Sequence, residues 1–244
     1  MNLIIDVGNT QVKLAVFGDG ELMFNAVCKK DLLLVELQKI KKNFLIEQSI
    51  ISTVAIFSED ELLEIKKIVP HIIQLSHKTP IPFKNLYSTP QTLGVDRVAI
   101  AAAAVSNYPD KNVLVIDAGT CITYDFVDEK GNYLGGAITA GIKMRYSSLN
   151  EFTDKLPLLD PKYPKSIIGN STAESIHSGI VNGVLAEIKS IINQYKEQYK
   201  KLTVVLTGGD TNFLAKRLKN GIFANPNFLL EGLNTILTYN CKND

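Results

Sequence analysis

The spacing of hydrophobic residues predicts two similar β-hairpins in this chain. In the first, an apolar run at residues 3–5 leads into Asp6, a polar turn follows, and large apolar residues then stand at every second position, at 12, 14 and 16. This pattern is typical of a strand, a tight turn and a returning strand. The same pattern recurs at residues 114–127, where Asp117 stands at the end of the apolar run.

Each hairpin carries a D-x-G turn, and the two turns align with each other. Gly8 follows Asp6 at the same distance at which Gly119 follows Asp117. Backbone N–H groups in such a turn suit a phosphate, and a neighbouring carboxylate suits a hydrated divalent cation. Two unrelated hairpins are the alternative, since turns are rich in Asp and Gly. The matching apolar flanks favour a duplicated fold that holds one nucleotide between its two halves.

The rest of the chain alternates between strand and helix patterns. Helical spacing is expected at residues 31–42, with Asp31 as N-cap, and at 58–69, which opens with a capping-box-like sequence. A long apolar stripe predicts a helix at 173–199 that needs another surface to cover it. Further strands are expected at 21–28, 49–54, 71–75, 133–139 and 202–206, and further helices at 92–109, 142–152 and 229–240. This alternation predicts mixed α/β layers.

A proline-rich loop precedes an alanine-rich helix. The loop, residues 78–91, contains Tyr87 and is either a linker or one wall of a site. After Gly94, Asp96 and Arg97 fall in the first helical turn, where the helix dipole stabilises an anion. Asp96 either complements the dipole alone or belongs to a site. Arg97 either pairs with Asp96 or binds a substrate carboxylate.

Glycines mark two further segments of the second half. Gly135, Gly136 and Gly141 permit close approach of another group to the backbone. The strand expected at 202–206 ends in T-G-G-D at residues 207–210. Such an end is either a place where adenosine lies against the backbone or a simple turn from strand to helix, and by itself the motif favours the simple turn.

Composition excludes several classes of protein. The 26 basic and 25 acidic residues nearly balance, so no charge field for nucleic acid or a membrane surface is expected. Three distant cysteines without a C-x-x-C pattern predict neither a disulfide framework nor a zinc site. The first apolar run leads directly into a strand and contains a carboxylate, which argues against a signal peptide, and no uncharged stretch has the length of a membrane span. We expect a cytoplasmic protein without nucleic-acid or membrane partners.

Five motifs in order make the chain resemble the type III pantothenate kinases over essentially its full length. They are D-x-G-N-T-x-x-K at 6–13, G-x-D-R at 94–97, D-A-G-T-x-x-T at 117–123, G-G-x-I-x-x-G at 135–141 and T-G-G-D at 207–210. That family belongs to the superfamily of acetate and sugar kinases, heat-shock chaperones and actin. The resemblance implies an α/β, duplicated ribonuclease-H-like (actin-like ATPase) fold, with mixed sheets flanked by helices and similar halves at 1–110 and 111–244.

The resemblance also implies a reaction: ATP phosphorylates pantothenate to 4′-phosphopantothenate, the first step of coenzyme A biosynthesis, in a homodimer. Asp96 is expected to be the general base. Substrate-binding residues are expected to be Tyr87, Gly94, Val95, Asp96, Arg97 and Thr172. ATP-binding residues are expected to be Asp6, Val7, Gly8, Asn9, Thr10, Gln11, Val12, Lys13 and Thr120. Asp117 is expected to bind a monovalent cation (K⁺ or NH₄⁺), and Asp6 to bind Mg²⁺ through water.

Some positions depart from the family pattern, and other functions stay open. Cys121 replaces a common alanine, Ala140 a common proline, and Ser171 a common asparagine. Lys13 either reaches a phosphate or pairs with a carboxylate. The alternative functions are a nucleotide-binding accessory or regulatory protein of the same fold, or a kinase for another small hydroxy or carboxylate substrate. The presence of all three aspartates, at 6, 96 and 117, favours catalysis over binding alone.

Overall fold

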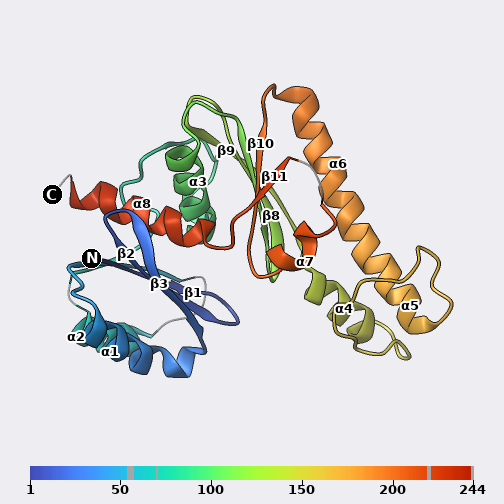
Figure 1. Ribbon diagram of the computed structural model, residues 1–244, viewed down its shortest axis with the longest axis horizontal. Helices are drawn as coiled ribbons and strands as arrows, with labels where there is room; N and C mark the ends of the chain where they lie inside the picture. The colour runs from blue at the N-terminus through green and yellow to red at the C-terminus, as the bar shows by residue number, and fades with distance from the viewer. Residues whose placement is uncertain (54–57, 70, 219–220, 243–244) are drawn as a thin grey trace. The chain divides into compact units, whose positions relative to one another are not determined.

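A computed structural model describes residues 1–53, 58–69, 71–218 and 221–242 of the chain. Strands β1 (Asn2–Val7), β2 (Val12–Gly18), β3 (Glu21–Cys28), β4 (Gln48–Thr53) and β5 (Ile72–Gln74) form one sheet. Strands β6 (Lys84–Asn85), β7 (Val113–Ala118), β8 (Cys121–Val127), β9 (Asn132–Ala140), β10 (Thr203–Thr207) and β11 (Ile222–Ala224) form the other. Helices flank both sheets (Figure 1).

Both sheets repeat one topology. The first has the order β3-β2-β1-β4-β5, and the second has β9-β8-β7-β10-β11 with β6 added at the β9 edge. In each, the first two strands are antiparallel, while the first strand pairs in parallel with the fourth and the fourth with the fifth. The central strands are therefore β1 and β7, which end at the two D-x-G turns. The predicted duplicated ribonuclease-H-like fold is confirmed.

The chain packs into two compact units. Unit 1 contains Met1–Pro109, Gly131–Tyr133 and Phe228–Asp244, and unit 2 contains Asp110–Lys130 and Leu134–Asn227. The predicted division of the sequence into two similar halves at residue 110 stays a prediction. By packing, the C-terminal helix α8 (Phe228–Cys241) belongs to unit 1. Residues on α8 pack against α3 (Val95–Asn107), β1 and β4.

In unit 1, helices α1 (Leu33–Asn43) and α2 (Glu59–Ile68) pack on the first sheet. Their buried residues form one hydrophobic cluster with residues of β1 and β2, which includes Leu3, Ile5, Leu14, Leu37 and Ile65. Residues 3 and 5 of β1 project to the same face of the sheet, because side chains alternate along a strand. The two helices therefore cover that face.

The starts of these two helices test two predictions. The predicted capping box of α2 is confirmed, because Ser58 and Glu61 exchange side-chain-to-backbone hydrogen bonds. The predicted N-cap role of Asp31 is wrong. A 3₁₀ turn at Lys30–Leu32 precedes α1, so backbone carbonyls at Lys29 and Lys30 accept the N–H groups that an N-cap side chain would otherwise serve.

Unit 2 contains helices α4 (Ile142–Glu151), α5 (Thr172–His177), α6 (Gly183–Gln198) and α7 (Thr211–Ala215). They share one hydrophobic cluster with residues of the second sheet. The helix predicted at 173–199 is confirmed in extent, but a π-helical segment, Ser178–Asn182, joins α5 to α6. Such segments are rare and occur often at functional sites. The apolar stripe of α6 is buried in the core of the second sheet, which supplies the covering surface that the sequence requires.

Two smaller differences concern the loop and one strand end. The predicted loop at 78–91 contains the two-residue strand β6, which pairs with β9, and a 3₁₀ turn at Pro90–Thr92. The strand predicted at 49–54 ends at Thr53, and Val54 lies outside the described residues. Across the described ranges, no helix has both the length and the apolar composition needed to cross a membrane.

Candidate active site

The first D-x-G turn connects β1 to β2 in unit 1. The Gly8 N–H donates a hydrogen bond to the Gln11 carbonyl (3.1 Å), which closes the turn and confirms the predicted hairpin. Asp6 lies opposite Lys13 on β2 and beside Ser52 on β4. The turn residues at 9–11 are exposed, so their backbone is open to a ligand beside the Asp6 carboxylate.

Asp6 is an unusual carboxyl group, because it is only 7% exposed. Burial raises the pKa of Asp6 to about 6, the positive charge of Lys13 opposes this shift, and the negative charge of Asp96 adds to it. The nearby hydroxyl of Ser52 also lowers this pKa. The effect of Asp96 on Asp6 means that the fold of unit 1 brings the first turn and the start of α3 together.

The start of α3 orients Asp96. Gly94 is the N-cap residue, and the Arg97 N–H donates to Asp96 Oδ1 (2.8 Å). A side chain at Gly94 would collide with Asp96 Oδ1, so a glycine is needed for the carboxylate to take this position. Asp96 therefore accepts a hydrogen bond from the first turn of the helix, and this contact holds its carboxylate in one orientation. Its role in a site stays a prediction.

Arg97 lies in an aromatic environment. It is 5% exposed, and its guanidinium carbon lies 5.6 Å from the ring centre of Tyr87 and 6.0 Å from that of Tyr133. These distances are those of cation–π contacts. Tyr133 is fully buried, and its carbonyl accepts a hydrogen bond from the Leu86 N–H (3.0 Å), which ties the Tyr87 loop to β9. Tyr133 is not among the site residues predicted from the sequence. The sequence feature that could have indicated it is its position as an aromatic residue just before the glycine-rich segment.

The second D-x-G turn connects β7 to β8 in unit 2. The Gly119 N–H donates to the Cys121 carbonyl (2.9 Å), which confirms the second hairpin. Asp117 lies opposite Thr123 on β8 and beside Thr207 on β10. The exposed residue at the tip is Thr120, one of the predicted ATP-binding residues.

Two other predicted motifs pack directly on this turn. The Gly141 N–H donates to the Thr120 carbonyl (3.1 Å), and a side chain at Gly141 would collide with the carbonyls of Gly119 and Thr120. Gly208 has φ +95°, and a side chain there would collide with the Asp117 carboxylate and the Ala118 carbonyl. The close approach predicted for the glycine-rich segment is therefore made, at Gly141, to the second turn itself.

The carboxylates near the turns are dispersed. Among the described residues, no three His, Cys, Asp or Glu side chains gather in a way that could hold a metal ion. Each turn instead combines one aspartate with one neighbouring buried hydroxyl, from Ser52 or Thr207. Mg²⁺ is commonly bound through one or two carboxylates together with waters and substrate phosphates, so this donor set fits a cation that arrives with a nucleotide.

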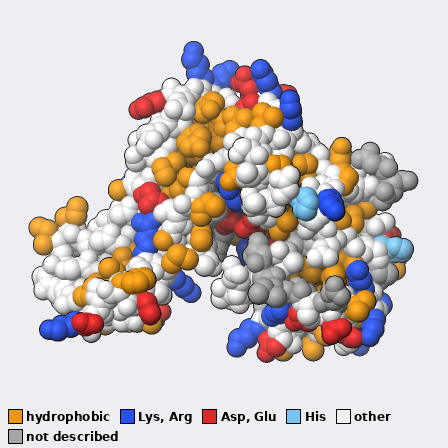
Figure 2. Space-filling view, turned by 180° about the vertical axis from the view of Figure 1, so that it is seen from behind, with side chains coloured by type: hydrophobic (Ala, Val, Ile, Leu, Met, Phe, Trp, Pro, Cys, Tyr) orange, Lys and Arg blue, Asp and Glu red, His pale blue; other side chains and the backbone are white. Residues whose placement is uncertain are grey.

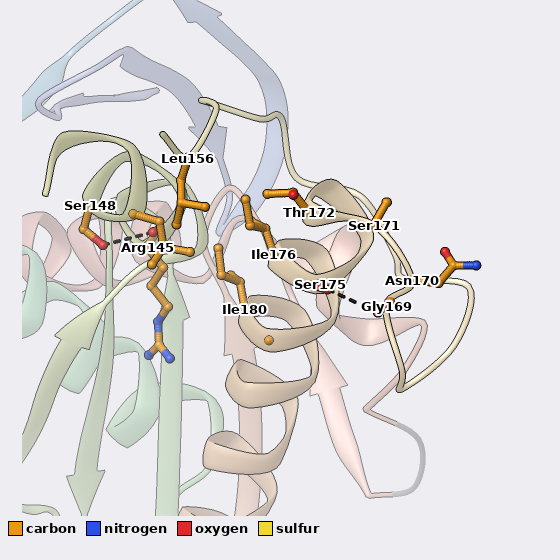
Figure 3. A pocket seen from close by; sticks show the side chains of 12 residues that line it. Arg145, Ser148, Leu156, Gly169, Asn170, Ser171, Thr172, Ser175, Ile176 and Ile180 are labelled. Atoms are coloured by element: carbon orange, nitrogen blue, oxygen red, sulfur yellow. Dashed lines mark hydrogen bonds between the residues drawn. The ribbon is translucent and has the colours of Figure 1, made fainter. Parts of the chain in front are cut away.

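Thr172 lines a pocket of about 880 Å³ in unit 2 (Figure 3). It is the first residue of α5, whose N-cap Ser171 accepts a hydrogen bond from the Glu174 N–H. Ile176 and Ile180 follow Thr172 along one side of the pocket, and Arg145 of α4 lies on the other (Figure 3). The pocket is therefore mixed in character, with an exposed hydroxyl at one end and apolar side chains below it.

Arg145 connects this pocket to the glycine-rich segment. Its guanidinium donates to the Ala140 carbonyl (2.9 Å), to Thr139 Oγ1 (3.2 Å) and to Glu187 Oε2 (2.7 Å). Glu187 also accepts a hydrogen bond from the Tyr124 hydroxyl (3.1 Å). The backbone at Ala140, which replaces a common proline of the family pattern, is thus held by a side-chain hydrogen bond.

Comparison with known proteins identifies the family. The model of the type III pantothenate kinase family matches residues 2–194. A type III pantothenate kinase of Christiangramia forsetii is 49% identical over 241 residues, which cover 98% of this chain and 99% of that protein. A type III pantothenate kinase of Flavobacterium johnsoniae is 46% identical, with 100% of both chains covered.

A solved structure supports the fold. A protein described as a putative Baf family transcriptional activator from Campylobacter jejuni superposes with a TM-score of 0.66 at 21% identity, covering 98% of this chain and 99% of that one. At this identity the likeness speaks for the fold alone. The family model, by contrast, spans the first four of the five motifs, and the Flavobacterium relative spans them all. The chain belongs to the type III pantothenate kinase family.

Proposed function

We propose that this chain, a pantothenate kinase of coenzyme A biosynthesis, transfers the γ-phosphoryl group of ATP to the 4′-hydroxyl of pantothenate with Asp96 as its general base. The observation that carries the proposal is the cluster in unit 1, where Lys13 and Asp96 both act on Asp6 and Arg97 lies next to Tyr87. This cluster contains residues of the first two family motifs. A protein of the family with these residues in place is expected to be active.

In the proposed reaction, the pantothenate hydroxyl oxygen attacks the γ-phosphorus. Its proton passes to the Asp96 carboxylate, and the bond to the β–γ bridging oxygen breaks as ADP leaves. The helix-start contact of Asp96 keeps its carboxylate in one orientation, which serves proton transfer. Arg97 and Tyr87 bind the carboxylate end of pantothenate, with the buried guanidinium as its charged partner.

The two turns bind the phosphates of ATP in this proposal. The turn of unit 1 contributes its backbone N–H groups and Lys13, and the turn of unit 2 contributes Thr120. When bound, Mg²⁺ near Asp6 and K⁺ or NH₄⁺ near Asp117 neutralise the charge of the phosphates. Asp6 acts in its ionised form, which its raised pKa of about 6 allows at neutral pH.

The test is a coupled ADP-release assay with ATP, Mg²⁺ and pantothenate, run in K⁺ and again in Na⁺ alone. We expect turnover that requires pantothenate and is faster in K⁺. ATP binding without turnover on pantothenate, followed by turnover on another hydroxy or carboxylate compound, would instead identify a kinase for a different substrate. ATP binding without any turnover would favour an accessory or regulatory protein of the same fold.

We further propose a homodimer in which Thr172 contributes to the pantothenate site. Unit 2 exposes large hydrophobic side chains on and near α4 and α5, in the part of unit 2 that lies at the left of Figure 2. They include Met144, Phe152, Leu158, Ile167 and Ile168, with exposures from 40% to 84%. Large apolar side chains that are strongly exposed in one part of a molecule are candidates for an interface between copies of a chain.

Mixing two variants that are each expected to be impaired tests this arrangement. Asp96→Asn and Thr172→Val chains are mixed and allowed to exchange subunits, while sedimentation reports the oligomeric state. If Thr172 serves the partner's site, each mixed dimer contains one intact site and activity returns. A monomer at assay concentration, or mixed dimers without regained activity, contradicts the shared site.

We also propose a cytoplasmic location, where ATP is available. Cell fractionation checks this proposal.

A further inference from the structure

Two buried hydroxyl groups occupy equivalent positions in the two sheets. Ser52 on β4 is in register with Asp6, and Thr207 on β10 is in register with Asp117. Ser52 is fully buried and Thr207 is 1% exposed. Neither hydroxyl makes a well-formed hydrogen bond within the part of the chain that the structure describes. Buried polar groups without such bonds are costly and uncommon, so two at matching positions call for an explanation.

The register places each hydroxyl beside a carboxylate. Residues side by side on neighbouring parallel strands project to the same face of a sheet, about 5 Å apart. In unit 1, Ser52 and Asp6 are register partners on neighbouring parallel strands, and both side chains are buried. In unit 2, the Asp117 carboxylate leans toward β10, because a side chain on Gly208, the residue after Thr207, would collide with it. The hydroxyls are therefore well placed to act on the aspartates of the two turns.

We propose that Ser52 and Thr207 are positioning residues, each of which donates a hydrogen bond to the neighbouring aspartate when its turn binds a cation. The inference rests on the proposed function, since it takes Asp6 and Asp117 as the carboxylates nearest the cations. A carboxylate that offers one oxygen to a cation keeps acceptor capacity on the other oxygen. A hydroxyl donor there fixes the orientation of the carboxylate, as outer-shell partners of metal ligands do.

This role explains why hydroxyl groups stand at these two buried positions. If a hydroxyl only fills space, a methyl group of the same shape can replace it without loss of protein stability. The reason is that burying a hydroxyl without a hydrogen bond costs free energy. A hydroxyl that becomes bonded upon ligand binding instead raises ligand affinity. Both roles predict that the free protein keeps its stability after this substitution. They differ in the response to the ligand, which is unchanged if the hydroxyl only fills space and weaker if the hydroxyl becomes bonded.

The test for unit 2 uses Thr207→Val, which removes the hydroxyl and keeps the shape, and Thr207→Ser, which keeps the hydroxyl. The melting temperature of the full chain is measured without substrates as K⁺ replaces choline at constant ionic strength. We expect Thr207→Val to be as stable as the unaltered protein or more stable without K⁺. It should need about 10–100-fold more K⁺ for the same rise in melting temperature. Thr207→Ser should restore the K⁺ response.

The test for unit 1 compares two buried serines of β4. Ser52→Ala removes the hydroxyl without a well-formed hydrogen bond, and Ser49→Ala removes one that donates to the His71 carbonyl (3.3 Å). We expect Ser52→Ala to require about 10-fold more Mg²⁺·ATP for the same thermal stabilisation. Ser49→Ala should lower the starting melting temperature and leave the Mg²⁺·ATP dependence unchanged. An effect at one of the two turns alone overturns the proposed equivalence.

Asp117→Asn separates this inference from the function on which it rests. If Asp117→Asn abolishes the K⁺ response and Thr207→Val leaves it intact, the role of Thr207 is overturned while the cation site stands. If neither substitution changes the K⁺ response, the cation site at Asp117 is overturned and the role of Thr207 falls with it. Loss of the response in both variants, with rescue by Thr207→Ser, is the outcome expected here.

Discussion

The two turns of this protein share one backbone arrangement and differ in what surrounds the central aspartate. Around Asp6 in unit 1, the influential neighbours are charged: Lys13 across the hairpin and Asp96 at the start of α3. In the sheet register, Asp6 lies between Lys13 and Ser52 and Asp117 lies between Thr123 and Thr207, so the residue opposite the aspartate is charged in unit 1 and carries a hydroxyl in unit 2. A duplicated topology can therefore carry two kinds of site, because the strands set the positions and the side chains set the chemistry.

The turns also differ in how their backbones are supported. The unit 2 turn is contacted by two glycines, Gly141 and Gly208, at which any side chain would collide with it. For the unit 1 turn, the glycine with a comparable role is Gly94, whose collision would be with the Asp96 carboxylate rather than with backbone. The glycines therefore allow close packing against the backbone of the turn in unit 2 and against the Asp96 carboxylate in unit 1.

The largest expected effect comes from Asp96, the residue that distinguishes the charged environment of unit 1. Asp96→Asn removes the general base and should lower kcat by about 10²–10⁴-fold. ATP binding, measured by calorimetry, should be unchanged, since the phosphates are bound by the turns. Near-full turnover in this variant would remove Asp96 from the role of base and weaken the contrast between the two units.

The second prediction concerns the rigid support of the unit 2 turn. Gly208→Ala should destabilise the protein, by about 1–3 kcal/mol for the positive φ alone, and the collision with Ala118 adds to this. Gly209→Ala is the matched control, because no atom lies within 4 Å of a side chain added there. Urea denaturation of both variants checks the difference. Equal stability of the two would mean that the turn is not held by Gly208.

Local patterns account for the parts of the fold that the sequence predicted correctly. The hairpins, the helix starting near Asp96 and the capping box at Ser58 each depend on residues close together in the chain. The N-cap assignment of Asp31 was wrong because a 3₁₀ turn ahead of the helix supplied backbone acceptors. The roles of Tyr133 and Thr207 were missed because they arise from pairing between strands that are distant in sequence.

The third prediction uses pH to test the charged environment of Asp6. Its pKa is raised from 3.8 to about 6 on folding, so the folded protein holds this proton more tightly than the unfolded chain. The contribution of this proton to the free energy of unfolding is fully present below about pH 4 and is lost as the pH rises through about 6. Asp6→Asn should therefore raise the melting temperature at pH 7.5 and change it little at pH 4. A loss of stability at pH 7.5 would contradict the dominance of burial.

The smallest expected effect comes from Lys13, whose role the sequence left open. Lys13→Met removes the charge that lowers the pKa of Asp6, so this pKa should rise above about 6 and the acid limb of kcat/KM for ATP should move to higher pH. If Lys13 also contacts a phosphate, KM for ATP rises at every pH, whereas a role through Asp6 alone leaves KM unchanged well above the pKa. Lys143→Met is the control, because it removes an equal charge that acts on Asp210 in unit 2. An acid limb that moves equally in both variants would show an effect of net charge, and the distinction between the two turns would then rest on Asp96 and the glycines.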